Sequence, residues 1–248
     1  MSPKPYAITL DVGSSRANHT GSWRDERPLY VDRMPPCNDA CPAGENVQAW
    51  LYEAEEGGAG YERAWRKLTE ENPFPAIMGR VCYHPCETAC NRGQLDEAVG
   101  IHAVERFLGD EAIARGWGFE RPAAANGKRV LVVGAGPSGL SAAYHLTRLG
   151  HAVSVREAGA APGGMMRYGI PRYRLPREVL DAEVRRILDL GVELELGRRV
   201  GNAAEEMAAG GFDACFLAVG AHIGRRAYVP AGEAARIVDA VSLLEGLE

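Results

Sequence analysis

Residues 130–139 read VLVVGAGPSG, and this stretch decides the fold of the C-terminal half of the chain. Its first four residues are apolar and mostly β-branched, which is typical of a strand buried in a parallel sheet. The three glycines that follow permit a tight turn, a close approach of the backbone to a pyrophosphate, and close packing of a helix on the strand. We expect the cofactor contacts of this turn to come from Gly134, Gly136, Pro137, Ser138 and Gly139.

The next 20 residues complete the same pattern. Apolar residues recur at helical spacing from Leu140 to Gly150, and AVSVR at 152–156 predicts a second strand. Glu157 stands at the tip of that strand, where a carboxylate can accept hydrogen bonds from a ribose hydroxyl and would repel a 2'-phosphate. Because strand, glycines, helix, strand and acid occur in order, we interpret the segment as a Rossmann-type dinucleotide site rather than an ordinary α/β turn.

Composition and charge exclude other classes of protein. The 248 residues carry a formal net charge of -5, which argues against the clustered Lys and Arg that bind nucleic acid. No apolar run approaches the roughly 20 residues that span a bilayer, and the first residues lack the pattern of a signal peptide. We therefore expect a cytoplasmic protein with neither a nucleic-acid nor a membrane partner.

Five of the six cysteines fall in two tight groups, CNDACP at 37–42 and CYHPCETAC at 82–90. A reducing cytoplasm disfavours disulfides, so this spacing predicts ligation of a metal or cluster. Bacterial ferredoxins end their ligand run in Cys-x3-Cys-Pro, which CNDACP matches. The predicted ligands are Cys37, Cys41, Cys82, Cys86 and Cys90.

The number of cysteines favours one 4Fe-4S cluster over two. Five cysteines cannot complete two four-cysteine clusters, and a second cluster would need Asp32, Glu105 or a partner chain. Zinc is the competing metal, since paired cysteines also bind it tetrahedrally, and plain buried thiols are a further alternative. Cys215 lies within an apolar strand and is interpreted as a core residue.

The chain in front of the glycine-rich turn has a helical pattern. Apolar residues recur at three- and four-residue spacing over 45–68, with a break at GGAG 57–60, and again over 100–115. RPAAANG at 121–127 reads as a linker. We predict an irregular arm at 1–30, a helical iron-sulfur domain at 31–120, and the first part of an α/β Rossmann-type FAD-binding domain at 128–248, which makes the fold α+β and multidomain.

Two later segments indicate FAD as the dinucleotide. APGGMMRYGIP at 161–171 resembles the Gly-Gly segment of two-dinucleotide-binding flavoproteins, which lies along the ribityl chain and pyrophosphate of the flavin. DACFLAVGA at 213–221 resembles the strand and glycine turn that close over the same cofactor. The resemblance implies cofactor contacts from Gly163, Gly164, Met165, Arg167 and Gly220.

The motifs taken together resemble one family. CNDACP, NPFP at 72–75, GRVCYHPCETAC at 79–90 and IHAVER at 101–106, followed by the glycine turn, look like the small (beta) subunit of glutamate synthase. The N-terminal part of dihydropyrimidine dehydrogenase is similar. The resemblance covers about Arg33 to the C-terminus. It implies that NADPH reduces FAD and that electrons leave through 4Fe-4S clusters to a second catalytic site.

The resemblance also implies a division of the cysteines between clusters. Cys41, Cys82 and Cys86 would ligate one cluster, with Glu105 near its fourth iron, and Cys37 and Cys90 would belong to the other. That other cluster lacks two upstream cysteines, because Leu29 and Asp32 occupy their places. Cys37 or Cys90 is then available to complete the surviving cluster.

The chain departs from the family after Gly220. Members of the family continue into a second Rossmann domain for NADPH, and nothing similar follows here. We expect a chain truncated before that domain, which needs a missing domain or a partner to react with NAD(P)H.

Three functions follow. The first is an electron-transfer component that carries FAD and a 4Fe-4S cluster and serves a partner redox subunit. The second is a non-catalytic cofactor-binding or assembly subunit, and the third is a zinc-stabilised nucleotide-binding protein. Other residues have structural interpretations: Trp50 and Trp65 as core, His84 and His102 as structural histidines, and the basic stretch 167–177 as solvated.

Overall fold

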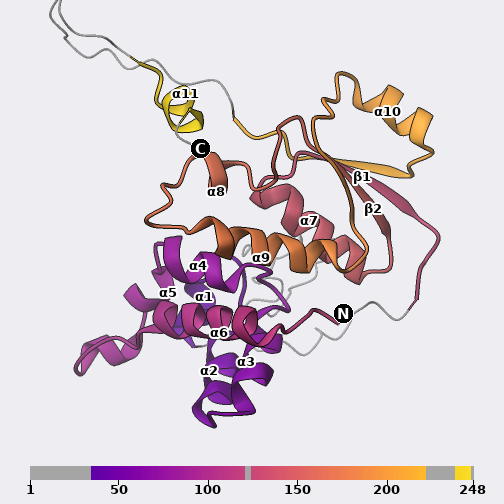
Figure 1. Cartoon of the computed structure of the whole chain (residues 1–248). Helices are drawn as coiled ribbons and strands as arrows, with labels where there is room; N and C mark the ends of the chain where they lie inside the picture. The colour runs from indigo at the N-terminus through magenta and orange to yellow at the C-terminus, as the bar shows by residue number, and fades with distance from the viewer. Residues whose placement is uncertain (1–34, 121–123, 222–237, 247–248) are drawn as a thin grey trace, which may run out of the picture. The chain divides into compact units, whose positions relative to one another are not determined.

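The computed structural model describes residues 35–120, 124–221 and 238–246. The arm predicted at 1–30 and part of the predicted linker lie outside these residues. The described residues from Pro35 onward pack as one compact unit (Figure 1). Of the helices described, none has the length and apolar character that crossing a bilayer requires.

The C-terminal half is built on a parallel sheet with the strand order β3-β2-β1-β4. The central strand β1 pairs in parallel with β2 on one side, where Val130 lies opposite Val153, and with β4 on the other. The predicted α/β fold of this half is therefore confirmed. The strands are β1 (Arg129–Val133), β2 (Ala152–Arg156), β3 (Glu193–Glu195) and β4 (Ala214–Leu217).

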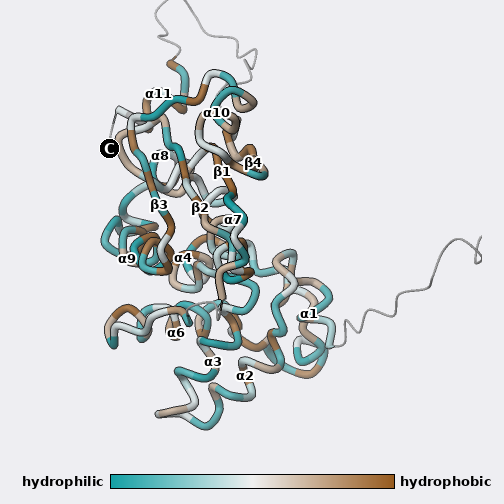
Figure 2. The backbone as a smooth tube through the Cα atoms, turned by 90° about the vertical axis from the view of Figure 1, so that its right-hand side faces the viewer, coloured by the Kyte–Doolittle hydropathy of each residue, from teal (hydrophilic) through white to brown (hydrophobic). Residues whose placement is uncertain are grey.

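Helices connect these strands and supply most of the core. The helix that follows the glycine-rich turn buries Leu140, Ala143 and Tyr144 against the sheet. Figure 2 shows brown, hydrophobic stretches along the strands and teal, hydrophilic stretches on the helices around them. The helices of this half are α7 (Pro137–Arg148), α8 (Met165–Tyr168), α9 (Arg177–Leu188), α10 (Ala203–Gly210) and α11 (Ala240–Glu245).

The N-terminal half is helical, as predicted. The break at GGAG separates two helices, and Trp50 and Trp65 are fully buried core residues. Three short helices that the periodicity did not predict begin at a proline, which suits the first helical position because it has no N–H to leave unpaired. The elements are α1 (Pro36–Ala40), α2 (Val47–Glu55), α3 (Gly60–Leu68), α4 (Pro75–Val81), α5 (Pro85–Thr88), a 3-10 turn (Asn91–Gln94) and α6 (Ile101–Arg115).

Helices α4 and α6 cross in direct backbone contact. A Cβ atom added at Gly79 would lie less than 3.0 Å from the backbone of Arg106, and one added at Gly109 would meet the backbone of Ala76 as closely. Only glycine permits this approach. The crossing fixes the C-terminal end of α4, which Cys82 directly follows, relative to the first turns of α6.

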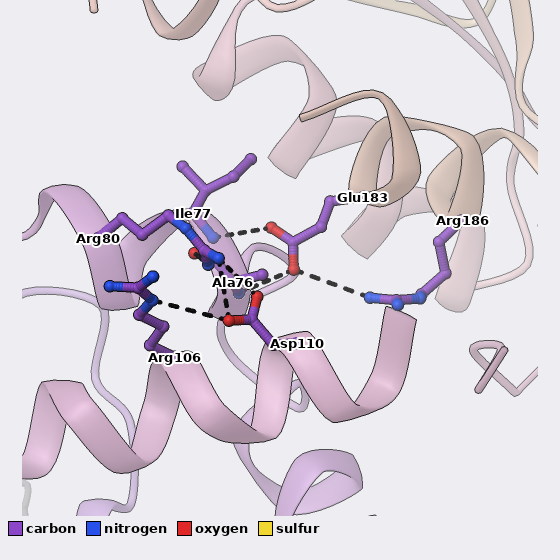
Figure 3. Close-up of polar contacts among 7 residues, drawn as sticks. All are labelled: Ala76, Ile77, Arg80, Arg106, Asp110, Glu183 and Arg186. Atoms are coloured by element: carbon purple, nitrogen blue, oxygen red, sulfur yellow. Dashed lines mark hydrogen bonds and ion pairs between the residues drawn. The ribbon is translucent and has the colours of Figure 1, made fainter. Parts of the chain in front are cut away.

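Helix α9 holds α4 against the Rossmann-type half. Phe74 and Ile77 belong to the same hydrophobic core as the strands and α7. The carboxylate of Glu183 accepts hydrogen bonds from the backbone N–H groups of Ala76 (2.9 Å) and Ile77 (3.2 Å), as Figure 3 shows. Glu183 therefore caps the N-terminus of a helix more than 100 residues away in sequence, which satisfies two donors that would otherwise be unpaired.

One sequence expectation for this region is wrong in part. Arg172 and Arg174 are exposed, as a solvated basic stretch requires. Arg167 is instead buried, because its Nε donates to the carbonyl of Pro162 and its guanidinium pairs with Asp181 on α9.

Substituting Gly109 by alanine should lower the free energy of unfolding by about 1–3 kcal/mol, because the new methyl group would overlap the backbone of Ala76. The better helix propensity of alanine, worth up to about 1 kcal/mol, offsets only part of this loss. Gly118→Ala is the control, since a Cβ there meets nothing within 4 Å. Equal denaturation midpoints for the two variants would contradict the close crossing.

The stability of the chain should depend on pH through Glu183. Burial raises the pKa of Glu183 from 4.5 to about 7, although two backbone N–H groups and the nearby Arg186 oppose the rise. Between these values the folded state holds a proton that the unfolded state has released, so stability falls as pH rises from 4.5 through 7. Relative to Glu183→Gln, the wild type should lose up to about 3 kcal/mol over this range. Parallel pH profiles in denaturant titrations would rule out this contribution.

Candidate cofactor sites

The glycine-rich turn has the geometry of a phosphate-binding loop. Gly134 has a φ of +106°, and a Cβ there would collide with the carbonyl of Ala218, which directly follows β4. A Cβ at Gly139 would collide with the carbonyl of Gly134, so α7 packs directly on the turn. Gly136 is the N-cap of α7 and has no side chain to bond the first N–H groups, which leaves them for an anion. The residues present fit a pyrophosphate, which would lie over Gly136, Pro137 and Ser138.

Glu157 lies at the carboxyl end of β2 beside this turn. Its Oε2 accepts a hydrogen bond from the N–H of Ala135 (2.7 Å), and its Oε1 accepts one from the N–H of Gly159 (2.7 Å). Each carboxylate oxygen keeps a further lone pair. Glu157 is therefore held rigidly and can still accept a ribose hydroxyl.

The Gly163–Gly164 segment is joined to the same turn. The N–H of Gly163 donates to the carbonyl of Ala135 (2.8 Å), and both glycines have positive φ values, +120° and +49°. A Cβ at Gly164 would overlap Gly136, so two glycine-rich segments meet backbone to backbone. A dinucleotide on the turn would thus run onto this segment.

Three further predicted contacts are placed differently. Met165 opens α8 with about half of its side chain exposed, where a ligand could cover it. Arg167 holds Pro162 and Asp181, so its role is to support the Gly163–Gly164 segment. Gly220 has a φ of +70° and lies exposed just beyond β4.

The structure gathers the five predicted cysteine ligands around α1, α4 and α5. Burial, with smaller contributions from the neighbouring Cys41 and Cys82, raises the pKa of Cys86 to about 12. Burial also raises the pKa of Cys37, and the nearby Cys90 adds to this rise. These interactions divide the cysteines into two groups, Cys41 with Cys82 and Cys86, and Cys37 with Cys90.

A buried polar network borders the three-cysteine group. The side-chain amide of Asn72 donates to Glu45 (2.9 Å) and to Glu105 (2.9 Å), and the indole N–H of Trp50 donates to Glu45 (3.2 Å). Burial raises the pKa of Glu105 well above its usual value, with Glu45 and Cys82 adding to the rise. Thiols and carboxyls so close together repel one another once ionised, so the group fits a cationic iron-sulfur core.

The cysteine sulfurs are spaced more widely than those of a preformed zinc site. Thiolates bound to Zn²⁺ at about 2.3 Å in a tetrahedron lie about 3.8 Å apart. Among the described residues, the group whose ligand atoms all lie within 4.8 Å of one another is His84, Glu87 and His102, and no cysteine belongs to such a group. A cluster separates its thiolates because each binds a different iron. Cys215 lies apart on β4, packed beside Leu131 and Val133.

Two family models match separate parts of the chain. Residues 25–117 match the family model of dihydropyrimidine dehydrogenase domain II, 4Fe-4S cluster. Residues 132–194 match the model of the NAD(P)-binding Rossmann-like domain. The glutamate synthase [NADPH] small chain of Mycobacterium tuberculosis is 36% identical over 213 residues, which are 85% of this chain and 43% of that protein.

The chain carries a 4Fe-4S and Rossmann-like region of the glutamate synthase small-chain type. This confirms the family resemblance and the fold class predicted from the sequence. The beta subunit of NADP(+)-dependent formate dehydrogenase from Moorella thermoacetica is 37% identical over 80% of this chain and 31% of that subunit. The beta subunit of NADPH-Fe(3+) oxidoreductase from Geobacter sulfurreducens is 36% identical over 78% of this chain and 29% of that subunit. The small-chain-type region thus spans less than half the length of these relatives.

Sequence reasoning missed the residues that hold the two sites together. No role was predicted for Glu183 or Glu45, and Asn72 was noted only as part of the NPFP motif, yet each is buried and hydrogen-bonded. A signal existed for Glu183, because Leu180, Val184 and Ile187 form an apolar stripe at helical spacing and Glu183 lies within it. A carboxylate on the buried face of a helix needs a partner, which here is the N-terminus of α4.

Iron content should distinguish ligands from other cysteines. Cys82→Ser and Cys86→Ser should each lose the iron of the three-cysteine group, because serine is a poor cluster ligand and the protein contributes few alternatives. Cys215→Ser is the matched control and should keep it. The iron content of the wild-type chain gives the number of clusters, about four atoms for one cluster and about eight for two, and a loss of iron in Cys37→Ser from a one-cluster chain would identify Cys37 as the fourth ligand. Full iron in both Cys82→Ser and Cys86→Ser would refute the assignment.

Proposed function

We propose that this chain is the FAD- and 4Fe-4S-binding part of an NAD(P)H-linked oxidoreductase. In this function it passes electrons between the two cofactors and to or from a partner subunit. When bound, FAD accepts a hydride and releases single electrons, which a 4Fe-4S cluster can carry. The residues of the chain supply the binding and orientation.

Helix α9 is the observation that carries the proposal, because it contacts both the Gly163–Gly164 segment and the helix that leads to Cys82. Leu180 lies against Gly163 in the segment expected to follow the flavin, and Asp181 pairs with Arg167 behind that segment. Two residues later, Glu183 caps α4. Helix α4 is seven residues, or about 10 Å, long and ends at Cys82. Helices α9 and α4 together would therefore connect the two proposed cofactor sites.

FAD is proposed as the dinucleotide on the same grounds. The Gly163–Gly164 segment is hydrogen-bonded to the glycine-rich turn, so the proposed binding surface continues beyond the pyrophosphate. Glu157 would bind the ribose, and the open N–H groups of α7 would bind the phosphates. The described residues contain a single strand-glycine-helix turn, so we propose that NAD(P)H binds to another domain or to a partner chain.

The partner and the compartment belong to the same proposal. Several relatives are named as subunits, which supports a partner redox subunit for this chain. A reducing, cytoplasmic location is part of the proposal, because cysteines that ligate a cluster must not be oxidised to disulfides. The match of residues 25–117 to a 4Fe-4S domain favours a cluster over the zinc-stabilised alternative, and a non-catalytic assembly role differs from the proposal in predicting no turnover.

Flavin binding should depend on Gly136. Gly136→Val would place a branched side chain where the pyrophosphate approaches the backbone. FAD affinity should fall at least about tenfold, since even ~1.4 kcal/mol of clash is a factor of ten, while iron content stays unchanged. Gly118→Val is the control, because that position faces open space. If the wild-type chain binds NAD but no FAD in equilibrium titrations, the flavin assignment is wrong.

A further inference from the structure

Three side chains beside the cysteine loop form an arrangement that the proposed function does not yet use. His84 lies between Cys82 and Cys86, Glu87 lies on α5, and His102 lies in the first turn of α6. The imidazole rings of His84 and His102 stack with centroids 3.9 Å apart and planes 24° apart. The Nδ1 of His102 is 2.8 Å from Oε1 of Glu87.

This arrangement is unsuited to holding a metal ion, although its ligand atoms lie within 4.8 Å of one another. An imidazole binds a metal through a lone pair that lies in the plane of the ring. Two rings stacked nearly parallel direct these lone pairs side by side, so they do not converge on one ion. Instead, the contacts of these three residues, which we call the clamp, join the loop before α5 to α5 and α6.

Glu87 ties α5 to α6. Its Oε1 accepts a hydrogen bond from the backbone N–H of His102 (3.0 Å) as well as the contact from the imidazole. The N-cap residue of α6 is Gly100, which has no side chain to bond this N–H. Glu87 therefore caps α6 from outside the helix, and the stack of His84 on His102 extends the clamp to the loop before α5.

The clamp holds His84 in an unusual backbone conformation. His84 has φ +54° and ψ +52°. Among the described residues, every other residue with a positive φ is a glycine. Side chains disfavour this left-handed region, so the surroundings must hold the residue there. In this conformation the backbone N–H of His84 points at Sγ of Cys82, 3.3 Å away.

We propose that His84, Glu87 and His102 are positioning residues that fix the N–H···S hydrogen bond to Cys82 and thereby raise the reduction potential of the cluster. The proposal rests on the proposed function, because it requires Cys82 to be a cluster ligand. A hydrogen bond to the sulfur stabilises the reduced cluster, which carries one more negative charge, and its loss makes reduction harder.

The test compares Glu87→Ala with Glu87→Gln in the iron-loaded chain, by redox titration followed by electron paramagnetic resonance of the reduced cluster. Both variants remove the same negative charge, which by itself shifts the potential upward. Glutamine keeps an oxygen that can accept both bonds from His102, whereas alanine keeps none. The potential of Glu87→Ala should therefore lie below that of Glu87→Gln, with an altered resonance signal. Equal potentials and signals would overturn the proposal.

A second pair of variants tests the same hydrogen bond by changing His84, the residue whose backbone N–H donates it. Glycine adopts the left-handed conformation freely, so His84→Gly can keep the N–H···S bond, and His84→Ala strains it. The potential should be lower in His84→Ala than in His84→Gly, and the reverse order would count against the proposal. If Glu87→Ala cannot be loaded with iron, this pair decides. A wild-type chain that binds no iron would instead refute the proposed function.

Discussion

The buried carboxylate of Glu183 is the constraint on which the arrangement of the two sites depends. Helix α4 has only seven residues, too few to be stable alone, and its first N–H groups need acceptors. Glu183 supplies them from α9, while Phe74 and Ile77 fill the core that the strands share. Because Cys82 directly follows α4, its position depends on the Rossmann-type half as well as on the helical half.

The same physical device recurs around the cysteines. Glu87 caps α6 from α5, and Asn72 joins Glu45 to Glu105 in a buried network. Each of these polar groups is costly to bury unless its partner is in place. The partners come from separate segments, so the network stabilises one arrangement of the helices. The close backbone contacts at Gly79 and Gly109 also favour this arrangement, because no side chain fits at either position.

Local patterns were enough to predict the parts of the fold, but contacts distant in sequence were not. The turn at 130–139 predicted β1 and α7 because each of its glycines has a local reason. The short helices α1, α4 and α5 escaped prediction, since four to seven residues show no period and their stability comes from tertiary contacts. The role of Arg167 was likewise hidden, because a basic residue in a polar stretch gives no sign that Asp181 will bury it.

The central claim is that one chain holds both cofactors close enough to exchange electrons. Flash reduction of FAD in the anaerobic, iron-loaded chain tests it most directly, with flavin and cluster absorbance followed together. The account predicts that flavin reoxidation and cluster reduction proceed in step, at a rate that does not change with protein concentration. A rate proportional to protein concentration would show that electrons pass only between molecules, and would contradict the account.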